Sequence, residues 1–319
     1  MSHPRRAFPA QFIERYSRII PDFDDFLVAM QMPLRRTART NLLKAEPAQV
    51  YELLAELGLT PLPWYPSGFT VEQGEKLGKR VEHFIGLIYV QEAASMVPPL
   101  VLGPEPGERV LDMAAAPGSK TTQMAGMMRN RGLLIANDSS PVRVRGLIGN
   151  VDRAGCLNTV ITRVDGQHLG RALAGTCDRV LVDAPCSSEG TIRKSVQAVD
   201  TWSVRQFDVF PRIQRGLIAA GFDALRPGGV MVYSTCTIAP EENECVISWF
   251  LEQTPDVRLL DIELPGLVMR PGLDGWLDER FPPDVVRCRR ILPQDNDTEP
   301  FFVALIQKGD GDGGEERGG

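Results

Sequence analysis

Histidine and paired cysteine are scarce in this chain of 319 residues, and their scarcity excludes several kinds of site. There are three histidines, His3, His83 and His168, so a Cys–His dyad or a histidine-based metal site is not expected. The six cysteines form no CxxC pair and lack metal-ligand spacing. We therefore expect no metal, and reduced thiols in a cytoplasmic protein are the simplest interpretation. The cysteines are Cys156, Cys177, Cys186, Cys236, Cys245 and Cys288.

Long apolar runs are missing too. No uninterrupted apolar stretch reaches the roughly 18 residues that a membrane span needs, and residues 1–8 contain no apolar signal-peptide core. We therefore expect neither a membrane partner nor export. A composition with 43% hydrophobic and 24% charged residues is typical of a globular protein of about two domains.

An excess of positive charge is also lacking, because 35 Lys and Arg stand against 41 Asp and Glu, a net charge of −6. This balance argues against a protein that coats nucleic acid generally, but it allows a local basic face. We take Arg39, Lys44, Arg193 and Lys194 as candidates to hold nucleic-acid phosphates, since they lie close to the motifs described below. The acidic residues 309–319 are expected to form a disordered tail.

The pattern of the chain changes near residue 92. Before it, a helix is expected to start at Pro47 and to end at Gly58, between extended pieces at 37–43 and 59–71. Its apolar stripe is Val50, Leu53, Leu54 and Leu57. Residues 1–92 therefore suggest a small α+β module.

Strands and helices alternate from residue 93 to residue 308, which is typical of an α/β, doubly wound parallel sheet. Helices are expected after Pro117, Ser140, Phe210 and Pro240. The expected strands are Arg109–Asp112, Leu133–Asn137, Val160–Val164, Arg179–Asp183, Gly229–Ser234, Val286–Ile291 and Phe301–Gln307.

Chemically useful residues follow three of these strands. Cys186 lies in Asp183–Ser187, Cys236 lies in Tyr233–Thr237, and a turn of small residues follows Asp112. Ligands in an open α/β sheet bind at the carboxyl ends of the strands, so the three clusters are expected to share one crevice. Two thiols and a small-residue loop in one crevice suggest a thiol-using transferase. Two buried packing cysteines are the alternative interpretation.

The turn after Asp112 is a candidate cofactor loop. It leads into a helix start, where backbone N–H groups and the helix dipole suit a carboxylate or phosphate. It matches neither a Walker loop nor GxGxxG. Asp138 after the next strand suits ribose hydroxyls, and Asp165 after the third suits an adenine amino group, although each also fits a helix cap. S-adenosylmethionine fits this series better than NAD, because nothing cradles a pyrophosphate. The loop residues are Ala114, Ala115, Ala116, Pro117, Gly118, Ser119 and Lys120.

Together these motifs resemble those of the Sun-type RNA cytosine-5 methyltransferases, most closely the bacterial RsmF-like branch. The resemblance includes Val110–Thr121, Asp183–Gly190, Leu225–Gly229 with Tyr233–Thr237, Arg39–Lys44, Tyr89–Met96, Pro240–Glu244 and Phe301–Ala304. It implies a Rossmann-like, seven-stranded class I methyltransferase domain with a small N-terminal RNA-binding module. It also implies S-adenosylmethionine as cofactor and ribosomal RNA as the favoured substrate. The chain ends soon after the last expected strand, so transfer RNA stays open as a substrate; we expect a monomer.

The resemblance also implies roles for the thiols. Carbon 5 of cytosine is a poor nucleophile, so a thiolate must first add to carbon 6. Family likeness assigns this addition to Cys236 and help in product release to Cys186, whereas spacing alone leaves Cys186 as an alternative nucleophile. Asp183 is expected to bind cofactor and to arrive protonated at ring nitrogen 3.

Two other functions remain open at this stage. An amino-group methyltransferase would share the cofactor loop, but such sites resemble Asn/Asp-Pro-Pro-aromatic, whereas this chain has Asp183-Ala184-Pro185-Cys186. An RNA-binding protein without catalysis is the other, and the joint presence of Asp183, Cys186 and Cys236 speaks against it.

Overall fold

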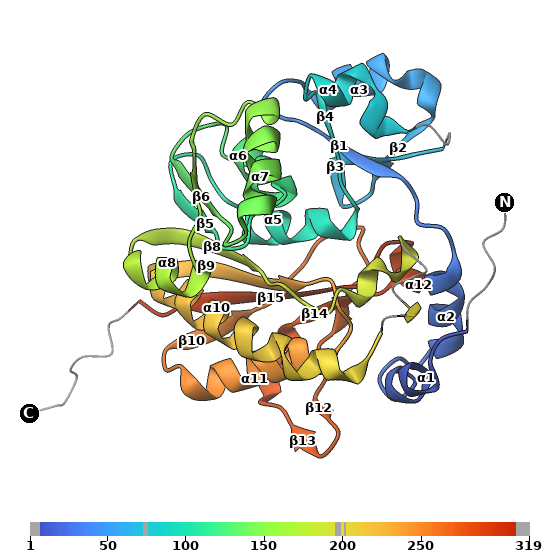
Figure 1. Ribbon diagram of the computed structural model, residues 1–319, viewed down its shortest axis with the longest axis vertical. Helices are drawn as coiled ribbons and strands as arrows, with labels where there is room; N and C mark the ends of the chain where they lie inside the picture. The colour runs from blue at the N-terminus through green and yellow to red at the C-terminus, as the bar shows by residue number, and fades with distance from the viewer. Residues whose placement is uncertain (1–6, 73–75, 195–198, 201, 311–319) are drawn as a thin grey trace, which may run out of the picture.

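The computed structural model describes residues 7–72, 76–194, 199–200 and 202–310 (Figure 1). The expected tail falls almost wholly on residues 311–319, outside the described part of the chain. No helix in the described part is long and apolar enough to span a bilayer.

Residues 37–90 form a small antiparallel sheet of four strands in the order β2-β3-β1-β4. The predicted helix covers it as α3 (Pro47–Leu53) followed by a 3₁₀ turn, η1 (Ala55–Leu57), and it ends at Gly58 with φ +64°. The prediction that Leu53 belongs to the buried apolar stripe is wrong, because this residue is 51% exposed. The α-helix ends at Leu53 and a 3₁₀ turn follows, so fewer residues of the segment face the sheet. The strands are β1 (Thr37–Thr40), β2 (Leu59–Leu62), β3 (Tyr65–Val71) and β4 (Ile88–Val90).

The first two helices, α1 (Ala10–Tyr16) and α2 (Phe23–Gln31), lie apart from this small sheet (Figure 1). Their buried aromatic side chains pack against Ile192, Ile238 and Leu292 of the larger part of the protein. Arg270 adds a bidentate ion pair to Asp22 at the start of α2. The first two helices therefore pack against the larger part of the protein, and the small sheet follows them in the sequence.

The large sheet has the order β11-β14-β15-β9-β8-β5-β6-β7, with β10 paired to β15. Strands β7, β6, β5, β8 and β9 are parallel, and β15 runs antiparallel to β9. Its centre is apolar on both faces, as expected for strands covered by helices on both sides. The strands are β5 (Arg109–Asp112), β6 (Leu133–Asn137), β7 (Thr159–Thr162), β8 (Cys177–Asp183), β9 (Leu225–Thr235), β10 (Val257–Leu260), β11 (Arg270–Pro271), β14 (Arg289–Ile291) and β15 (Phe301–Lys308).

All seven predicted strands fall in this sheet, but the one predicted at Val286–Ile291 is too long. Residues 283–287 form a 3₁₀ turn, η7 (Pro283–Arg287), and only β14 pairs with β15. Two consecutive prolines, Pro282 and Pro283, fix φ and remove two backbone donors just before it, which favours the turn over a strand. The edge strand β10 was not predicted.

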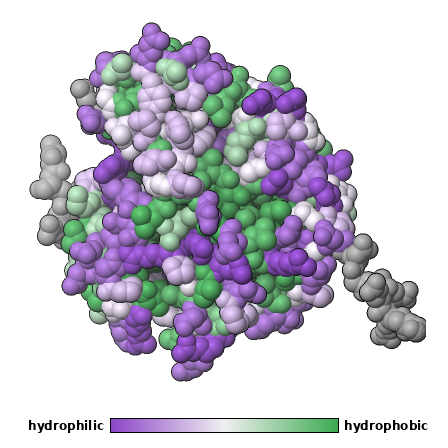
Figure 2. Space-filling model, turned by 180° about the vertical axis from the view of Figure 1, so that it is seen from behind, coloured by the Kyte–Doolittle hydropathy of each residue, from purple (hydrophilic) through white to green (hydrophobic). Residues whose placement is uncertain are grey.

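Helices cover the sheet in two layers (Figure 1). One layer holds α5 (Val97–Leu102), α6 (Ser119–Met127) and α7 (Pro141–Ala154), and the other holds α8 (Gly166–Ala172), α10 (Phe210–Ala224) and α11 (Glu244–Gln253). The remaining short elements are η2 (Leu77–Lys79), α4 (Val81–Phe84), η3 (Ala94–Met96), η4 (Glu189–Arg193), η5 (Val204–Asp208), β12 (Gly275–Trp276), β13 (Glu279–Arg280), η6 (Pro240–Glu242) and α12 (Pro293–Asn296). On the face seen from behind, apolar side chains gather around the middle and hydrophilic ones towards the edges (Figure 2).

Candidate active site

The two motif cysteines lie against each other where β8 and β9 end. These strands are parallel neighbours in which Asp183 pairs with Ser234, so the residues that follow leave the sheet at the same edge. The sulfur atoms of Cys186 and Cys236 are 3.4 Å apart. Both cysteines are free, and Cys236 is the more exposed.

The environment distinguishes the two thiols. The hydrogen bond between them, followed by burial, raises the pKa of Cys186 well above its usual value. The same hydrogen bond lowers the pKa of Cys236, with a smaller contribution from Ser188 and against the effect of burial. Either sulfur can donate in this contact, and the lowered pKa and greater exposure of Cys236 make it the more easily ionised thiol.

A buried ion pair lies beside the thiols. Lys120, near the start of α6, donates to Asp183 Oδ2 at 2.6 Å and to Ser95 Oγ at 3.1 Å. Ser234 donates to Asp183 Oδ1 at 2.8 Å. Burial opposes the charge on Lys120, but its pKa is raised because the charge and hydrogen bond of Asp183 outweigh burial. Lys120 was predicted as a cofactor residue; its amine faces Asp183, and the cofactor role stays a prediction.

The same contacts bear on the expected protonation of Asp183. Both carboxylate oxygens accept hydrogen bonds, one of them from an ammonium group. Asp183 is thus held through both oxygens, and its expected protonation stays a prediction.

A cavity opens between the ends of β5, β6, β7 and β8. Ala114, Asp138 and Asp165 all line it, as the sequence places them, and the other lining residues are Met113, Asn137, Ser139, Arg143, Gly166, Gln167, Pro185, Ile213 and Leu217. Asp138 is buried and accepts from Ser140 N at 2.9 Å. Its Oδ2 makes no hydrogen bond within the described part of the chain and lies 3.2 Å from Arg143 Nη2. A buried carboxylate oxygen without a donor is suited to a ligand hydroxyl.

The rest of the predicted loop builds the turn. Ala115 N donates to Asn137 O at 2.7 Å, and Gly118 N donates to Ala115 O at the same distance. Gly118 has φ +105°, and a Cβ there would lie 3.0 Å from the side chain of Leu147. Ala115, Ala116, Pro117, Gly118 and Ser119 do not line this cavity, and their cofactor role stays a prediction. Asp165 caps α8 by accepting from Gln167 N at 2.8 Å, and it still lines the cavity.

Two of the four predicted phosphate contacts are wrong. Arg39 is buried, with 2% of its surface exposed, and donates to Gln91, to the carbonyl of Ser119 and to Thr122. Arg193 is also buried and donates to the carbonyl of Thr298 and to Asp297. Both guanidinium groups hold segments of the protein together, because a buried charge needs such partners.

The two lysines of that set lie nearer to solvent. Lys44 is exposed, and its amine donates to the carbonyls of Ile85 and Arg153, each at 2.8 Å. Lys194 has half of its side chain exposed and pairs with Glu299 at 3.0 Å. Both can still meet a phosphate group.

Several residues of the site were missed by sequence reasoning. Ser95 and Ser234 lie within motifs named above but were given no role, and Arg143 was not named. Glu242 accepts from Ser187 N at 3.0 Å and from Gln214 Nε2 at 2.8 Å, and so supports the loop that carries Cys186. Burial raises the pKa of Glu242 to about 7. The roles of these side chains depend on partners that are distant in the sequence, so only the folded structure reveals them.

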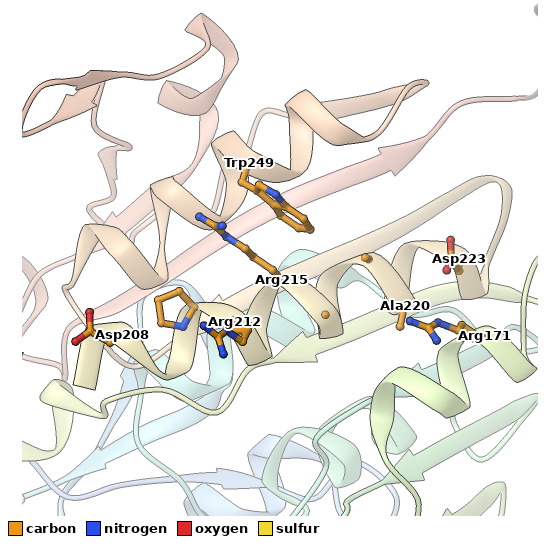
Figure 3. Close-up of a pocket in the computed structure, with 10 residues that line it drawn as sticks. Arg171, Asp208, Arg212, Arg215, Ala220, Asp223 and Trp249 are labelled. Atoms are coloured by element: carbon orange, nitrogen blue, oxygen red, sulfur yellow. The ribbon is translucent and has the colours of Figure 1, made fainter. Parts of the chain in front are cut away.

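A larger cavity of about 530 Å³ lies along α10 on the side of α8 and α11 (Figure 3). Arg215 stacks on the ring of Trp249 there, at 5.2 Å from the centroid. Of the residues that the structure describes, no cysteine and none of the predicted cofactor residues line it. Residues of α10 line both this cavity and the one at the strand ends. Size alone therefore does not mark the candidate active site. Among the described residues, no group of three His, Cys, Asp or Glu side chains could hold a metal ion.

The sheet and the cavity at its carboxyl edge define a class I methyltransferase. A methyltransferase homologue of known structure from Pyrococcus horikoshii has a TM-score of 0.84 and 35% identity, covering 95% of this chain and 96% of its own. The structure titled NSun6 from Pyrococcus horikoshii with SFG has a TM-score of 0.80 at 24% identity, covering 95% of this chain and 98% of its own, and supports the fold alone.

The particular family follows from the sequence. Residues 99–307 match the model described as 16S rRNA methyltransferase RsmB/F, and residues 8–93 match the N-terminal domain of 16S rRNA methyltransferase RsmF. The chain belongs to this RsmB/F family of RNA methyltransferases, and the predicted Sun-type, RsmF-like resemblance is confirmed.

Two named relatives differ in length. The tRNA (cytosine(49)-C(5))-methyltransferase of Pyrococcus abyssi is 44% identical over 301 residues, 93% of this chain and 96% of that protein. The ribosomal RNA small subunit methyltransferase F of Escherichia fergusonii is 44% identical over 313 residues, 94% of this chain and 63% of that protein. The chain therefore spans less than two thirds of the second relative.

Proposed function

We propose that the protein transfers the methyl group of S-adenosylmethionine to carbon 5 of a cytosine in RNA through a covalent cysteine adduct. The observation that carries this proposal is the pair of thiols 3.4 Å apart beside the Lys120–Asp183 ion pair. An amino-group methyltransferase needs no thiol, and a protein that only binds RNA needs none of these contacts. Membership of an RNA methyltransferase family supports the same reaction.

The residues divide the work as follows. Cys236, the thiol with the lowered pKa, adds as thiolate to carbon 6 of the ring. Asp183 lies at the ring nitrogen edge, and the ammonium of Lys120 supplies the positive charge and the proton that the electron-rich ring needs. After methyl transfer the proton on carbon 5 must pass to a base before the bond between Cys236 and carbon 6 can break, and Cys186, beside the nucleophile, assists this release.

The cavity at the ends of β5 to β8 fits the cofactor. S-adenosylmethionine, when bound, supplies an electrophilic methyl group. Asp138 has a buried oxygen that pairs with Arg143 but makes no hydrogen bond, so it can accept from ribose hydroxyls, and Asp165 lies at the next strand end for an adenine amino group. Arg143 ties Asp138 to the turn by pairing with its carboxylate and donating to Ala116 O at 2.6 Å.

Ribosomal RNA is the favoured substrate, on the match of residues 8–93 to the RsmF N-terminal domain. Transfer RNA is the second candidate, because the named transfer RNA enzyme is matched over 96% of its length. In either case the cytosine must leave its stack to reach a buried thiol, which favours an unpaired nucleotide. Lys44 and Lys194 are proposed to meet phosphates near the crevice.

The test is transfer of labelled methyl groups from S-adenosylmethionine to total RNA, followed by mapping of 5-methylcytosine. We expect the label in one RNA class at a defined cytosine. The Cys245→Ala variant is the matched control, since Cys245 lies in α11 outside the site. Label on adenine or on protein, or no transfer at all, would contradict the proposed reaction. RNA binding should weaken as salt rises, through counterion release.

A further inference from the structure

Glu189, at the start of η4, is a buried carboxylate that accepts hydrogen bonds from four donors. It is 2% exposed. Its Oε1 accepts from the hydroxyl of Tyr16 at 2.5 Å and from the indole N–H of Trp202 at 2.6 Å. Its Oε2 accepts from Thr237 Oγ1 at 2.6 Å and from Ile238 N at 3.1 Å. One side chain thereby joins segments from four separate parts of the chain.

Two of these contacts lie directly beside the candidate nucleophile. Thr237 and Ile238 follow Cys236, and Gly190 N donates to the carbonyl of Cys236 at 2.8 Å. A Cβ at Gly190 would come within 2.8 Å of that carbonyl oxygen, so only glycine allows this approach. Gly190 therefore holds the carbonyl of Cys236, and Glu189 holds the two residues that follow it.

The same pair belongs to the loop that carries the other thiol. Ser187 Oγ and Thr237 Oγ1 are 2.8 Å apart, a second connection between the Cys186 loop and the Cys236 loop. The distance between the two sulfur atoms thus depends on how the two loops are tied together. Glu189 contributes two of those ties, from Thr237 and from Ile238 N.

The other carboxylate oxygen extends this arrangement to the N-terminal helices. Tyr16 is the last residue of α1, and Phe12 in the same helix packs edge to face on Trp202, with ring centroids 5.4 Å apart. Burial, followed by the charge of Glu189, raises the pKa of Tyr16 well above its usual value. The phenol therefore stays protonated and keeps donating.

A carboxylate is the group that this position requires. All four partners donate, and an ionised carboxylate offers four acceptor sites and no donor. An amide in its place would turn an NH₂ group towards two other donors and leave them unsatisfied. Glutamine has nearly the same shape as glutamate, so it tests the chemistry of the contact with little change in packing.

We propose that Glu189 is the positioning residue for the nucleophile Cys236 and that, through Tyr16, it makes helix α1 part of the active site. This inference rests on the proposed function for its catalytic consequence. It assigns the N-terminal helix a second task beside any contact with RNA: α1 fixes the carboxylate that sets the geometry of the thiols.

The experiment compares the full-length variants Glu189→Gln, Tyr16→Phe and Trp202→Phe with the wild-type protein. The matched control is Tyr51→Phe, whose hydroxyl donates to the carbonyl of Pro66 in the small sheet. Two readouts are used: kcat for methyl transfer to RNA, and the pH dependence of Cys236 alkylation by iodoacetamide without RNA. Calorimetric S-adenosylmethionine affinity and the folded fraction are measured in parallel.

Glu189→Gln is expected to lower kcat about 100-fold, the scale for displacing a reacting group by about 1 Å. It should also move the alkylation profile of Cys236 and change cofactor affinity by less than about twofold, because Glu189 does not line the cofactor cavity. Tyr16→Phe and Trp202→Phe remove one donor each, so we expect about a fivefold loss of kcat. Tyr51→Phe should match the wild type in both readouts.

A purely structural role predicts a different result. In that case Glu189→Gln lowers thermal stability while kcat per folded molecule and the alkylation profile stay unchanged, and the proposal is wrong. If Glu189→Gln does not fold, unchanged readouts in both Tyr16→Phe and Trp202→Phe overturn it. A wild-type protein that methylates no RNA cytosine would refute the proposed function instead, and the alkylation profile would still decide the positioning role.

Discussion

Replacing Lys120 with methionine tests the ion pair at the centre of the site. Methionine keeps the length and apolar stem of the side chain but removes the ammonium that donates to Asp183 and Ser95. Asp183 would then keep Ser234 as its donor. We expect Lys120→Met to lower kcat about 10²–10³-fold, which is the loss seen when a preorganised donor is removed from a developing charge.

The same substitution has a cost in stability that can be estimated from the structure. Removing one partner of a buried ion pair costs about 3–5 kcal/mol. The side chains here are 10% and 26% exposed, so water screens Asp183 in part and we expect about 2–3 kcal/mol. Denaturant unfolding measures this term separately from activity, and single-turnover methyl transfer at saturating RNA measures the catalytic loss.

A double-mutant cycle with Asp183→Asn completes the test. If the two residues act as one unit, Lys120→Met/Asp183→Asn should be hardly less active than either single variant. The control is Lys308→Met. Lys308 is the last residue of β15, away from the thiols, and it donates to the carbonyls of Phe222 in α10 and Leu225 in β9. A Lys120→Met enzyme with kcat within threefold of wild type, beside an inactive Asp183→Asn, would refute the role given to Lys120.

Three further predictions follow from individual side chains. Cys236→Ala should abolish methyl transfer and any covalent RNA adduct, whereas Cys186→Ala should methylate once and accumulate an adduct on a denaturing gel; the reverse pattern would exchange the roles. Asp138→Ala should weaken S-adenosylmethionine binding by about 1–3 kcal/mol, and an unchanged calorimetric affinity would remove it from the cofactor site. Burial raises the pKa of Asp112 to about 7 from 3.8, against a hydrogen bond from Thr121. Below about pH 4 this group costs nothing, and its penalty grows as the pH rises towards 7 because only the unfolded chain ionises. Asp112→Asn should therefore gain stability over wild type across that range, by up to on the order of 4 kcal/mol, and a pH-independent difference in Tm would contradict the linkage.

Much of the fold could be predicted from the sequence, because local patterns of apolar and turn-forming residues specify its strands and helix ends. The strands β5 and β6 have the predicted bounds, since short apolar runs ending in Asp112 and Asn137 are characteristic of buried parallel strands. Gly58 ends its helix as predicted, because its positive φ suits glycine. The errors came where local chemistry competes, as at Pro282 and Pro283 before β14.

The candidate site was only partly predictable, for the same reason. The positions of Cys186 and Cys236 after neighbouring strands were predictable, because parallel strands end at one edge of a sheet. The burial of Arg39 and Arg193 was not predictable, because each looks like surface charge in the sequence. Their hydrogen-bond partners lie more than 50 positions away along the chain.

The sequence by itself determined the class of sheet, the order of its strands along the chain and the residue types at each strand end. These depend on hydrophobic periodicity and on turn chemistry, which act over a few residues. Only the tertiary structure decided that Lys120 faces Asp183, that Asp138 pairs with Arg143 at the cavity and that Tyr16 of the first helix reaches Glu189. Such contacts join residues 63 and 173 positions apart, and in a buried site the energy of a polar group depends on the partner that the fold brings to it.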